Sequence, residues 1–504
     1  MSITRYFAAT AAAIFGLGTS FATDVTVTTP GTLSATLSSA GEDLATVTTL
    51  TVSGTVNAAD LYDLGNKAVA LETLDLSAAT IVAYDGNSLN GSKTYKAGLI
   101  PSGAFAGSSI QRITLPTAAT EIGHMAFAAS KLTALPKMTT VTAIGDGAFS
   151  NCTNLAVTLA YPAKVEKVGS HVFSNCTSIT TVNMGTATEI PPYTFVGCTA
   201  LNRVSPTSQL QHIGTGAFAD CTALSRFNFG EALKSIGAMA FMNTALADAD
   251  LSKSNALASV GDFAFAKNDK LASANFGNVS LPAMGKGVFF DDSALASVIL
   301  PDGLTELPAY ILKGTTSVNM NTLPTELETI GDYALLGNTA TTQITIPIQV
   351  TYIGTGAMEG MTGLQLIDVE HLEHVADLGE DVWAGVDKEH VRLRVPLFLA
   401  DTYQSTPQWQ DFQFDVMTGV DDENIADTQA VSVQGRFSGS DLQIQSQGAE
   451  MDVVNVFDPA GQLLVAVRPA SDFIVIDTAA FTNPLFIVSV RLANGKTAAL
   501  KLKR

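Results

Sequence analysis

The 504-residue sequence has few of the residues that most catalytic and nucleic-acid-binding sites require. It contains only four cysteines, six histidines and two tryptophans, and its 27 basic side chains face 47 acidic ones. The net charge of -20 argues against nucleic acid or an anionic membrane surface as the main partner. Gly-x-Ser-x-Gly elbows, His-Glu-x-x-His helices and calcium-binding loops are all absent. We therefore expect no enzyme, no catalytic residue, no metal and no cofactor.

Long apolar runs are also absent beyond the first residues of the chain. Arg5 precedes the apolar run Tyr6–Leu17, and Ser20-Phe21-Ala22 offers a small-x-small cleavage site before Thr23. The run is shorter than the roughly 20 residues of a spanning helix. We interpret residues 1–22 as a secretory signal peptide and expect no transmembrane segment in the mature chain; an uncleaved anchor is the alternative.

One short phrase, Ile-Gly-x-x-Ala-Phe, is abundant and returns about every 23 residues between Ile100 and Trp383. Its closing apolar residue lies at Phe105, Phe127, Phe149, Phe173, Phe195, Phe218, Phe241, Phe265, Phe289, Leu312, Leu335, Met358 and Trp383. A unit this short cannot bury its own apolar face. The units must stack into one continuous core, which predicts a solenoid.

Each unit combines two apolar periods. In Leu201–Pro206 the spacing is that of a short strand, with Leu201 and Val204 inward and Arg203 and Ser205 outward. The Gly-x-x-Ala-Phe portion has helical or 3₁₀ spacing. A glycine follows Ile or Val where the chain must turn, a position suited to positive φ. These glycines are Gly123, Gly145, Gly169, Gly214, Gly237, Gly261, Gly331 and Gly354.

These units resemble the BspA-like subfamily of leucine-rich repeats, which shares the Ile-Gly, Ala-Phe, Cys-Thr and Leu-x-x-Val-x-Leu-Pro elements. The resemblance implies a leucine-rich repeat solenoid, with a parallel β-sheet and short helical or 3₁₀ segments, over residues 100–390. Residues 23–99 resemble the family's N-terminal capping leucine-rich segment, and 391–418 its C-terminal cap. We interpret Trp383 and Trp409 as core plugs and not as a sugar-binding platform.

Residues 419–432 are acidic and polar and are predicted to form a linker. Residues 433–504 read as a small β-sandwich domain, with expected strands at Asp441–Gln445, Val453–Phe457, Ile474–Asp477, Leu485–Arg491 and Thr497–Lys501. This order resembles the C-terminal sorting domain of type IX secretion cargo, although Asn483-Pro484-Leu485-Phe486 replaces the family's Gly-x-Tyr. The resemblance implies recognition by the secretion machinery and passage across the outer membrane of a Bacteroidetes-type bacterium, to the cell surface or the medium.

The four cysteines each lie three residues after the Phe of their unit, so stacking places them in one column. They are Cys152, Cys176, Cys198 and Cys221. Their Cβ atoms should be about 4.8 Å apart and parallel, whereas a disulfide needs about 3.8 Å. We expect buried free thiols in preference to disulfides, and four ligands in a line cannot surround a metal tetrahedrally. Because no cysteine precedes Cys152, a lipid-anchored lipoprotein is excluded.

The histidines form no catalytic pattern. His124, His171 and His212 occupy three different positions within their units. The cluster Glu370-His371-x-Glu373-His374 offers ligands, but it lies in a degenerate unit and is interpreted as a solvated edge. The two Gly-Thr-Gly segments, at 214–216 and 354–356, follow from the repeat and need no phosphate.

The outward positions of the predicted strands form a paired column of small polar and charged side chains. They are Arg112, Thr114, Thr181, Asn183, Arg203, Ser205, Arg226, Asn228, Asp248, Asp250, Ser273 and Asn275. Arg203 and Arg226 are conspicuous on an acidic protein because guanidinium groups bind carboxylates in a forked pair. An ordinary solvated sheet would show similar residues.

Two functional hypotheses follow. The first is a non-enzymatic, secreted or surface-displayed binding protein whose sheet face contacts a host matrix or cell-surface protein. Family resemblance makes this adhesin-like. The second is a glycan-binding or envelope structural protein in which the solenoid serves as a spacer.

Overall fold

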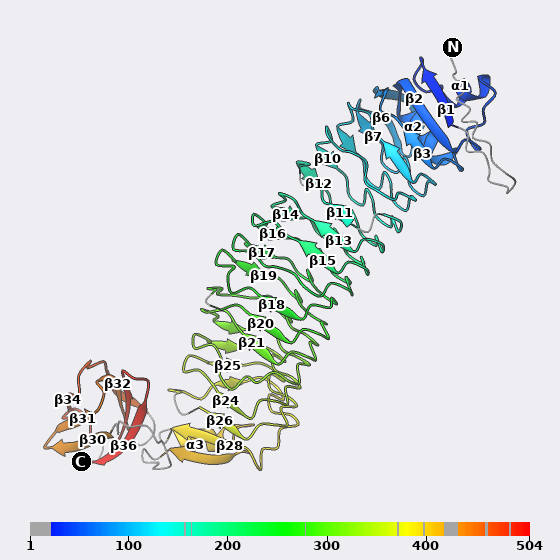
Figure 1. Ribbon diagram of the computed structural model, residues 1–504. Helices are drawn as coiled ribbons and strands as arrows, with labels where there is room; N and C mark the ends of the chain where they lie inside the picture. Colours follow the sequence, from blue (N-terminus) through cyan, green and yellow to red (C-terminus); the bar gives the residue numbers. More distant parts are fainter. Residues whose placement is uncertain are drawn as a thin grey trace. The chain divides into compact units, whose positions relative to one another are not determined.

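A computed structural model describes residues 22–155, 158–162, 164–277, 279–369, 372–396, 399–417, 432–458, 462–482 and 485–504 (Figure 1). The predicted signal peptide and linker lie almost wholly outside these residues. The chain divides into two compact units, one ending at Asp302 and one running from Gly303 to Arg504, and each is described by itself. Both contain stacked coils with little helix, so the predicted solenoid fold is confirmed.

The first unit begins with a mixed α and β segment before the regular coils. Its elements are β1 (Ala22–Val27), α1 (Leu33–Ser39), β2 (Thr49–Val56), α2 (Ala58–Asn66), β3 (Thr73–Asp75), β4 (Ala79–Ile81), β5 (Tyr84–Leu89) and β6 (Ser92–Tyr95). Strands β1, β2 and β3 pair in parallel. Asn57 and Asp60 form a capping box on α2, and Asp60 also accepts hydrogen bonds from the amides of Gly31 and Leu33. One carboxylate thus fixes the entry to both helices.

From β7 onward, the strands of the first unit belong to two parallel walls, and a coil can contribute a strand to each. The long-strand wall contains β8 (Arg112–Thr114), β11 (Thr158–Ala160), β13 (Thr181–Asn183), β15 (Arg203–Ser205), β18 (Asp248–Asp250), β20 (Ser273–Asn275) and β21 (Ser297–Ile299). The short-strand wall contains β7 (Leu99–Ile100), β9 (Glu121–Ile122), β10 (Ala143–Ile144), β12 (Lys167–Val168), β14 (Glu189–Ile190), β16 (His212–Ile213), β17 (Ser235–Ile236) and β19 (Ser259–Val260). In most long strands the middle residue is buried and its neighbours face outward.

The Gly-x-x-Ala-Phe segment is a succession of turns, and the prediction of helical or 3₁₀ structure there is wrong. Alternate amides bond in different directions. Ala148 and Ser150 donate to carbonyls three residues back, whereas Gly147, Phe149 and Asn151 donate to the next coil at 2.8, 3.0 and 2.7 Å. Residues 147 and 151 have φ of +61° and +58°, which turns these amides along the stack. The segment therefore forms a third hydrogen-bonded wall.

The glycines that follow Ile or Val do not have positive φ, so their predicted role is wrong. Glycine is required at these positions because the backbone of the preceding coil leaves no room for a Cβ atom. A Cβ on Gly145 would lie 2.6 Å from the backbone nitrogen of His124, and one on Gly261 would lie 2.4 Å from that of Ala238. Positive φ occurs instead two residues before and after the Phe, where Tyr193 has φ of +55°.

The repeated phenylalanines fill the centre of the first unit. All nine from Phe105 to Phe289 are fully buried. Rings of neighbouring coils stack with centroids 5.3 to 5.9 Å apart and interplanar angles of 2° to 17°. Offset stacking of this kind adds to the free energy of apolar burial. The phenylalanine of each coil is therefore buried by the phenylalanines of the neighbouring coils.

A second internal column lies three residues after each phenylalanine, and it satisfies backbone carbonyls. The four cysteines are free and buried there, as predicted. Cys176 Sγ donates to the carbonyl of Phe149 at 3.2 Å, and Asn268 Nδ2 donates to that of Phe241 at 3.1 Å. Asp292 occupies the same position and is also fully buried. The column therefore selects small hydrogen-bond donors.

Asp292 is the exception because an ionised carboxylate cannot donate. Its Oδ1 accepts the amide of Asn268 at 2.7 Å, but among the described residues its Oδ2 has no hydrogen-bond partner. Burial raises the pKa of Asp292 well above its usual value, and the nearby Asp269 and Asp291 act in the same direction. The folded chain thus favours the protonated acid at this position.

The second unit continues the same two kinds of strand and ends in a cap. Its short strands are β22 (Glu306–Leu307), β23 (Thr329–Ile330), β25 (Tyr352–Ile353) and β27 (Asp377–Leu378). Its long strands are β24 (Gln343–Thr345), β26 (Leu366–Asp368), β28 (Arg392–Pro396) and β29 (Gln413–Met417). After β28, α3 (Ala400–Ser405) places Tyr403 against Trp409. Trp383 and Trp409 are fully buried with centroids 5.1 Å apart, so both are core plugs as predicted.

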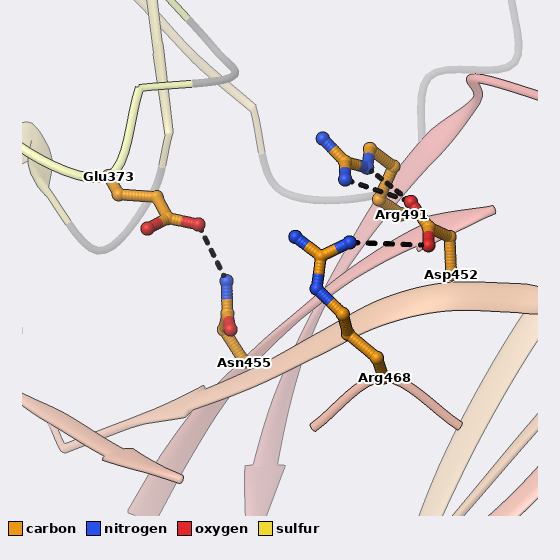
Figure 2. A network of polar contacts seen from close by, with 5 residues as sticks. All are labelled: Glu373, Asp452, Asn455, Arg468 and Arg491. Atoms are coloured by element: carbon orange, nitrogen blue, oxygen red, sulfur yellow. Dashed lines mark hydrogen bonds and ion pairs between the residues drawn. The ribbon is translucent and has the colours of Figure 1, made fainter. Parts of the chain in front are cut away.

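The described residues from Ser432 to Arg504 form two antiparallel sheets. One contains β30 (Ser432–Ser438), β31 (Asp441–Gln447) and β34 (Phe473–Asp477), and the other contains β33 (Leu463–Val467), β32 (Met451–Phe457), β35 (Leu485–Leu492) and β36 (Thr497–Lys503). All five expected strands are present, while β30 and β33 were not foreseen. Figure 2 shows Asp452 between two arginines, with Arg491 Nη2 at 2.8 Å and Arg468 Nη1 at 3.7 Å. These sheets are consistent with the expected small β domain.

Candidate binding face

The strands of the long-strand wall in the first unit carry ten of the twelve predicted binding residues, and the other two, Arg226 and Asn228, lie in a coil that joins β15 only through an isolated bridge at Arg226. None of the twelve side chains is buried. In β15, for example, Val204 is buried whereas Arg203 is exposed. Parallel pairing aligns Thr181 with Arg203 and Asn183 with Ser205, and likewise Asp248 with Ser273 and Asp250 with Asn275. Arg112 and Thr114 pair with Thr73 and Asp75 in the N-terminal sheet. The twelve residues therefore occupy the same side of successive coils but do not form one continuous hydrogen-bonded sheet.

Arg203 and Arg226 lie directly side by side. A parallel β-bridge joins them across adjacent coils, and both side chains are exposed. Neighbouring strands are about 4.8 Å apart. Within the described part of the chain, neither guanidinium has an acidic partner within 4.0 Å. Two adjacent cations are thus available to a ligand.

A second arginine pair on long strands provides an internal comparison. Arg392 and Arg394 lie on β28 in the second unit. Arg394 Nη1 is 3.5 Å from Asp368 Oδ2, and Asp415 Oδ2 is 3.7 Å from Arg394 Nε and 3.6 Å from Arg392 Nη1. Aspartates on both neighbouring strands therefore compensate this pair, unlike Arg203 and Arg226.

Several of the predicted residues also shape the turn that follows their strand. Asn183 Oδ1 accepts the amide of Gly185 at 3.0 Å, and Asn275 Oδ1 accepts that of Gly277 at 2.8 Å. Asp250 Oδ1 accepts both the hydroxyl and the amide of Ser252, and these bonds lower the pKa of Asp250. Asn or Asp followed two residues later by Gly or Ser was the signal for this turn.

The histidines remain apart, as their positions predicted. His124 Nδ1 lies 3.5 Å from Asp146, His171 stacks on Tyr193 at 4.7 Å, and His212 Nδ1 bonds the Ser235 hydroxyl at 2.8 Å. Glu370 and His371 lie outside the described residues. Glu373 bonds Asn455 at 3.1 Å (Figure 2), and His374 Nε2 bonds the carbonyl of Val350 at 3.1 Å. Among the described residues, no three His, Cys, Asp or Glu side chains form a group suited to a metal ion.

Comparison with known proteins supports the interpretation of the chain as a leucine-rich repeat protein. The model of the BspA type leucine rich repeat region matches residues 91–202, 188–291 and 258–388, together more than half of the chain. The chain belongs to this family. Its members are typically surface or secreted proteins that mediate protein interactions, and they are usually not enzymes.

Among solved structures, a leucine-rich repeat protein from Bacteroides ovatus is similar, with 20% identity and a TM-score of 0.56 over 74% of this chain and 88% of that one. A leucine rich cell surface protein from Faecalibacterium prausnitzii is also similar, with 22% identity and a TM-score of 0.37 over 56% of this chain and 85% of that one. At 20% identity, the likeness to the Bacteroides ovatus protein concerns the fold alone. No curated protein matches the chain. Over the residues that the structure describes, none of the helices has the length and apolar character of a membrane span.

Proposed function

We propose that this protein is a non-enzymatic, adhesin-like binding protein that is secreted or displayed on the cell surface. Its ligand is a host-matrix or cell-surface protein, and the binding residues lie on the long-strand wall of the first unit. The uncompensated pair Arg203 and Arg226 carries this proposal. A guanidinium pair without an internal partner retains its capacity for forked hydrogen bonds to carboxylates.

The comparison within the chain supports this assignment. Aspartates on adjacent strands form ion pairs with Arg392 and Arg394. The long strands can therefore place an acidic residue beside an arginine. Arg203 and Arg226 have no equivalent partners among the described residues. Because exposed charges contribute little to stability, their presence is better explained by binding.

The test is binding of the full mature chain to a panel of purified extracellular-matrix and cell-surface proteins. Changing Arg203→Glu and Arg226→Glu should weaken capture by about tenfold or more, because it replaces attraction by repulsion at two positions. The matched control, Lys167→Glu with Lys286→Glu, makes the same change of charge at exposed sites outside the long-strand wall. Equal capture by both double variants would exclude this face.

We further propose that residues 1–22 direct export and that 433–504 act as a sorting domain for passage across the outer membrane. The two antiparallel sheets support a separate C-terminal module of suitable size. Deleting 433–504 should leave the solenoid in the periplasm of its native host. Detection of the deletion variant in the medium or on the cell surface would refute this route.

A further inference from the structure

The sign of the exposed charge changes along the long-strand wall of the first unit. Arg203 and Arg226 are joined by the β-bridge, and the following coil carries Asp248 and Asp250. The amide of Ala247 donates to the carbonyl of Ser225 at 3.3 Å, which places Asp248 beside Arg226 in the stack. Three successive coils thus present a cation, a cation and an acidic pair.

The acidic end of this row consists of two carboxylates on one strand, β18. Asp248 and Asp250 are both exposed. Two hydrogen bonds from Ser252 stabilise the Asp250 carboxylate and hold it in place. A ligand that covers the two arginines and continues along the stack in this direction must meet these carboxylates.

We infer that the ligand is a zwitterionic protein segment, in which two carboxylates are followed by a cationic side chain along the stacking direction. This inference rests on the proposed function. A polyanion such as a sulfated glycan would place negative charge against Asp248 and Asp250, on a protein whose net charge is -20. Like charges brought together in this way penalise the wrong partner.

The spacing of the charges indicates which backbone presents them. Neighbouring strands are about 4.8 Å apart, and side chains four residues apart on a helix are about 5–6 Å apart. Three successive coils span about 9.6 Å, whereas three side chains at intervals of four on a helix span about 12 Å and three alternate side chains of an extended strand span about 13 Å, so a helix matches the row more closely. The partner segment is therefore a helix with acidic, acidic and basic residues at intervals of four.

The experiment compares two stapled helical peptides, one with Glu, Glu and Lys at intervals of four residues and one with Glu at all three positions. Binding of each to the full mature chain is measured by interferometry. The mixed peptide should bind roughly two- to fivefold more tightly than the all-acidic peptide. In Asp248→Asn with Asp250→Asn, this preference should disappear or reverse. Asparagine preserves the turn, since Asn183 and Asn275 already make the same bond.

The outcomes test the inference and the proposed function separately. If the all-acidic peptide binds the unaltered chain as tightly as the mixed one, or neither binds below about 1 mM, the inference is wrong. Tighter binding of heparin than of the mixed peptide would also overturn it in favour of a polyanion. The proposed function fails separately, if Arg203→Glu with Arg226→Glu leaves capture of the protein panel unchanged.

Discussion

A methyl group added at Gly237 should open the stack between two coils. The Cβ of an alanine there would lie 2.4 Å from the backbone nitrogen of Thr215 and 2.6 Å from the carbonyl carbon of Gly214. Ordinary contact begins near 3.4 Å, so the coils must separate by about 1 Å. They cannot do so without stretching the 2.7 Å bond from the Gly237 amide to the carbonyl of Ile213.

The loss of stability caused by Gly237→Ala can be estimated from overpacking in protein cores, which typically costs about 1–3 kcal/mol. The upper part of that range applies because the obstructing atoms are backbone. Reduced entropy of the unfolded chain offsets about 0.4–1 kcal/mol. We expect Gly237→Ala to lower the free energy of unfolding by about 2 kcal/mol, measured by urea titration with circular dichroism.

Gly230 is the matched control. It lies in the same coil, its φ is not in the left-handed region, and an added Cβ would meet nothing within 4 Å. Gly230→Ala should therefore leave stability unchanged or raise it by up to about 1 kcal/mol. If the two variants have the same urea midpoint, close approach of the coils is not the reason for the repeated glycine.

Two further predictions concern the internal polar column. Because burial raises the pKa of Asp292, the folded chain holds a proton that the unfolded chain releases above about pH 4, so this residue costs stability as pH rises. Asp292→Asn should be about 1–3 kcal/mol more stable than the unaltered chain at pH 8 and lose that advantage near pH 4, in urea titrations at both values; a pH-independent difference would refute protonation. Burial also raises the pKa of the Cys176 and Cys221 thiols, so Ellman's reagent should find almost no reactive thiol in the native protein at pH 8 and four after unfolding without reductant. Fewer than four would indicate a disulfide.

The period of the phenylalanines was sufficient to predict stacking, because burial of Phe105 to Phe289 requires neighbours on both sides. The alternation within Leu201–Pro206 likewise identified the inward Val204 and the outward Arg203. These predictions succeed because they depend on side-chain periodicity, which any parallel stack must respect. The same reasoning placed the four thiols in one buried column.

Features that depend on the neighbouring coil could not be predicted from one unit. The repeated glycine was expected to supply a turn. At Gly145 and Gly261 the reason for glycine is instead close contact with the backbone of His124 and Ala238, 21 and 23 residues earlier in the chain. The apolar spacing around Phe149 suggested a helical or 3₁₀ segment. Spacing alone contains no information about the direction in which the backbone amides point. The compensation of Arg394 by Asp368 and Asp415 was likewise invisible, since all three lie on different strands.

Residue-resolved hydrogen exchange tests most directly whether each coil is held by the next. The amides of Phe127, Phe149 and Phe218 lie in turns, yet they donate to Ala148, Val172 and Ala240 of the following coil at 2.8, 3.0 and 2.8 Å. We predict that these amides exchange as slowly as those of the long strands. Rapid exchange at these positions in the folded protein would contradict the stacked solenoid and the binding face that depends on it.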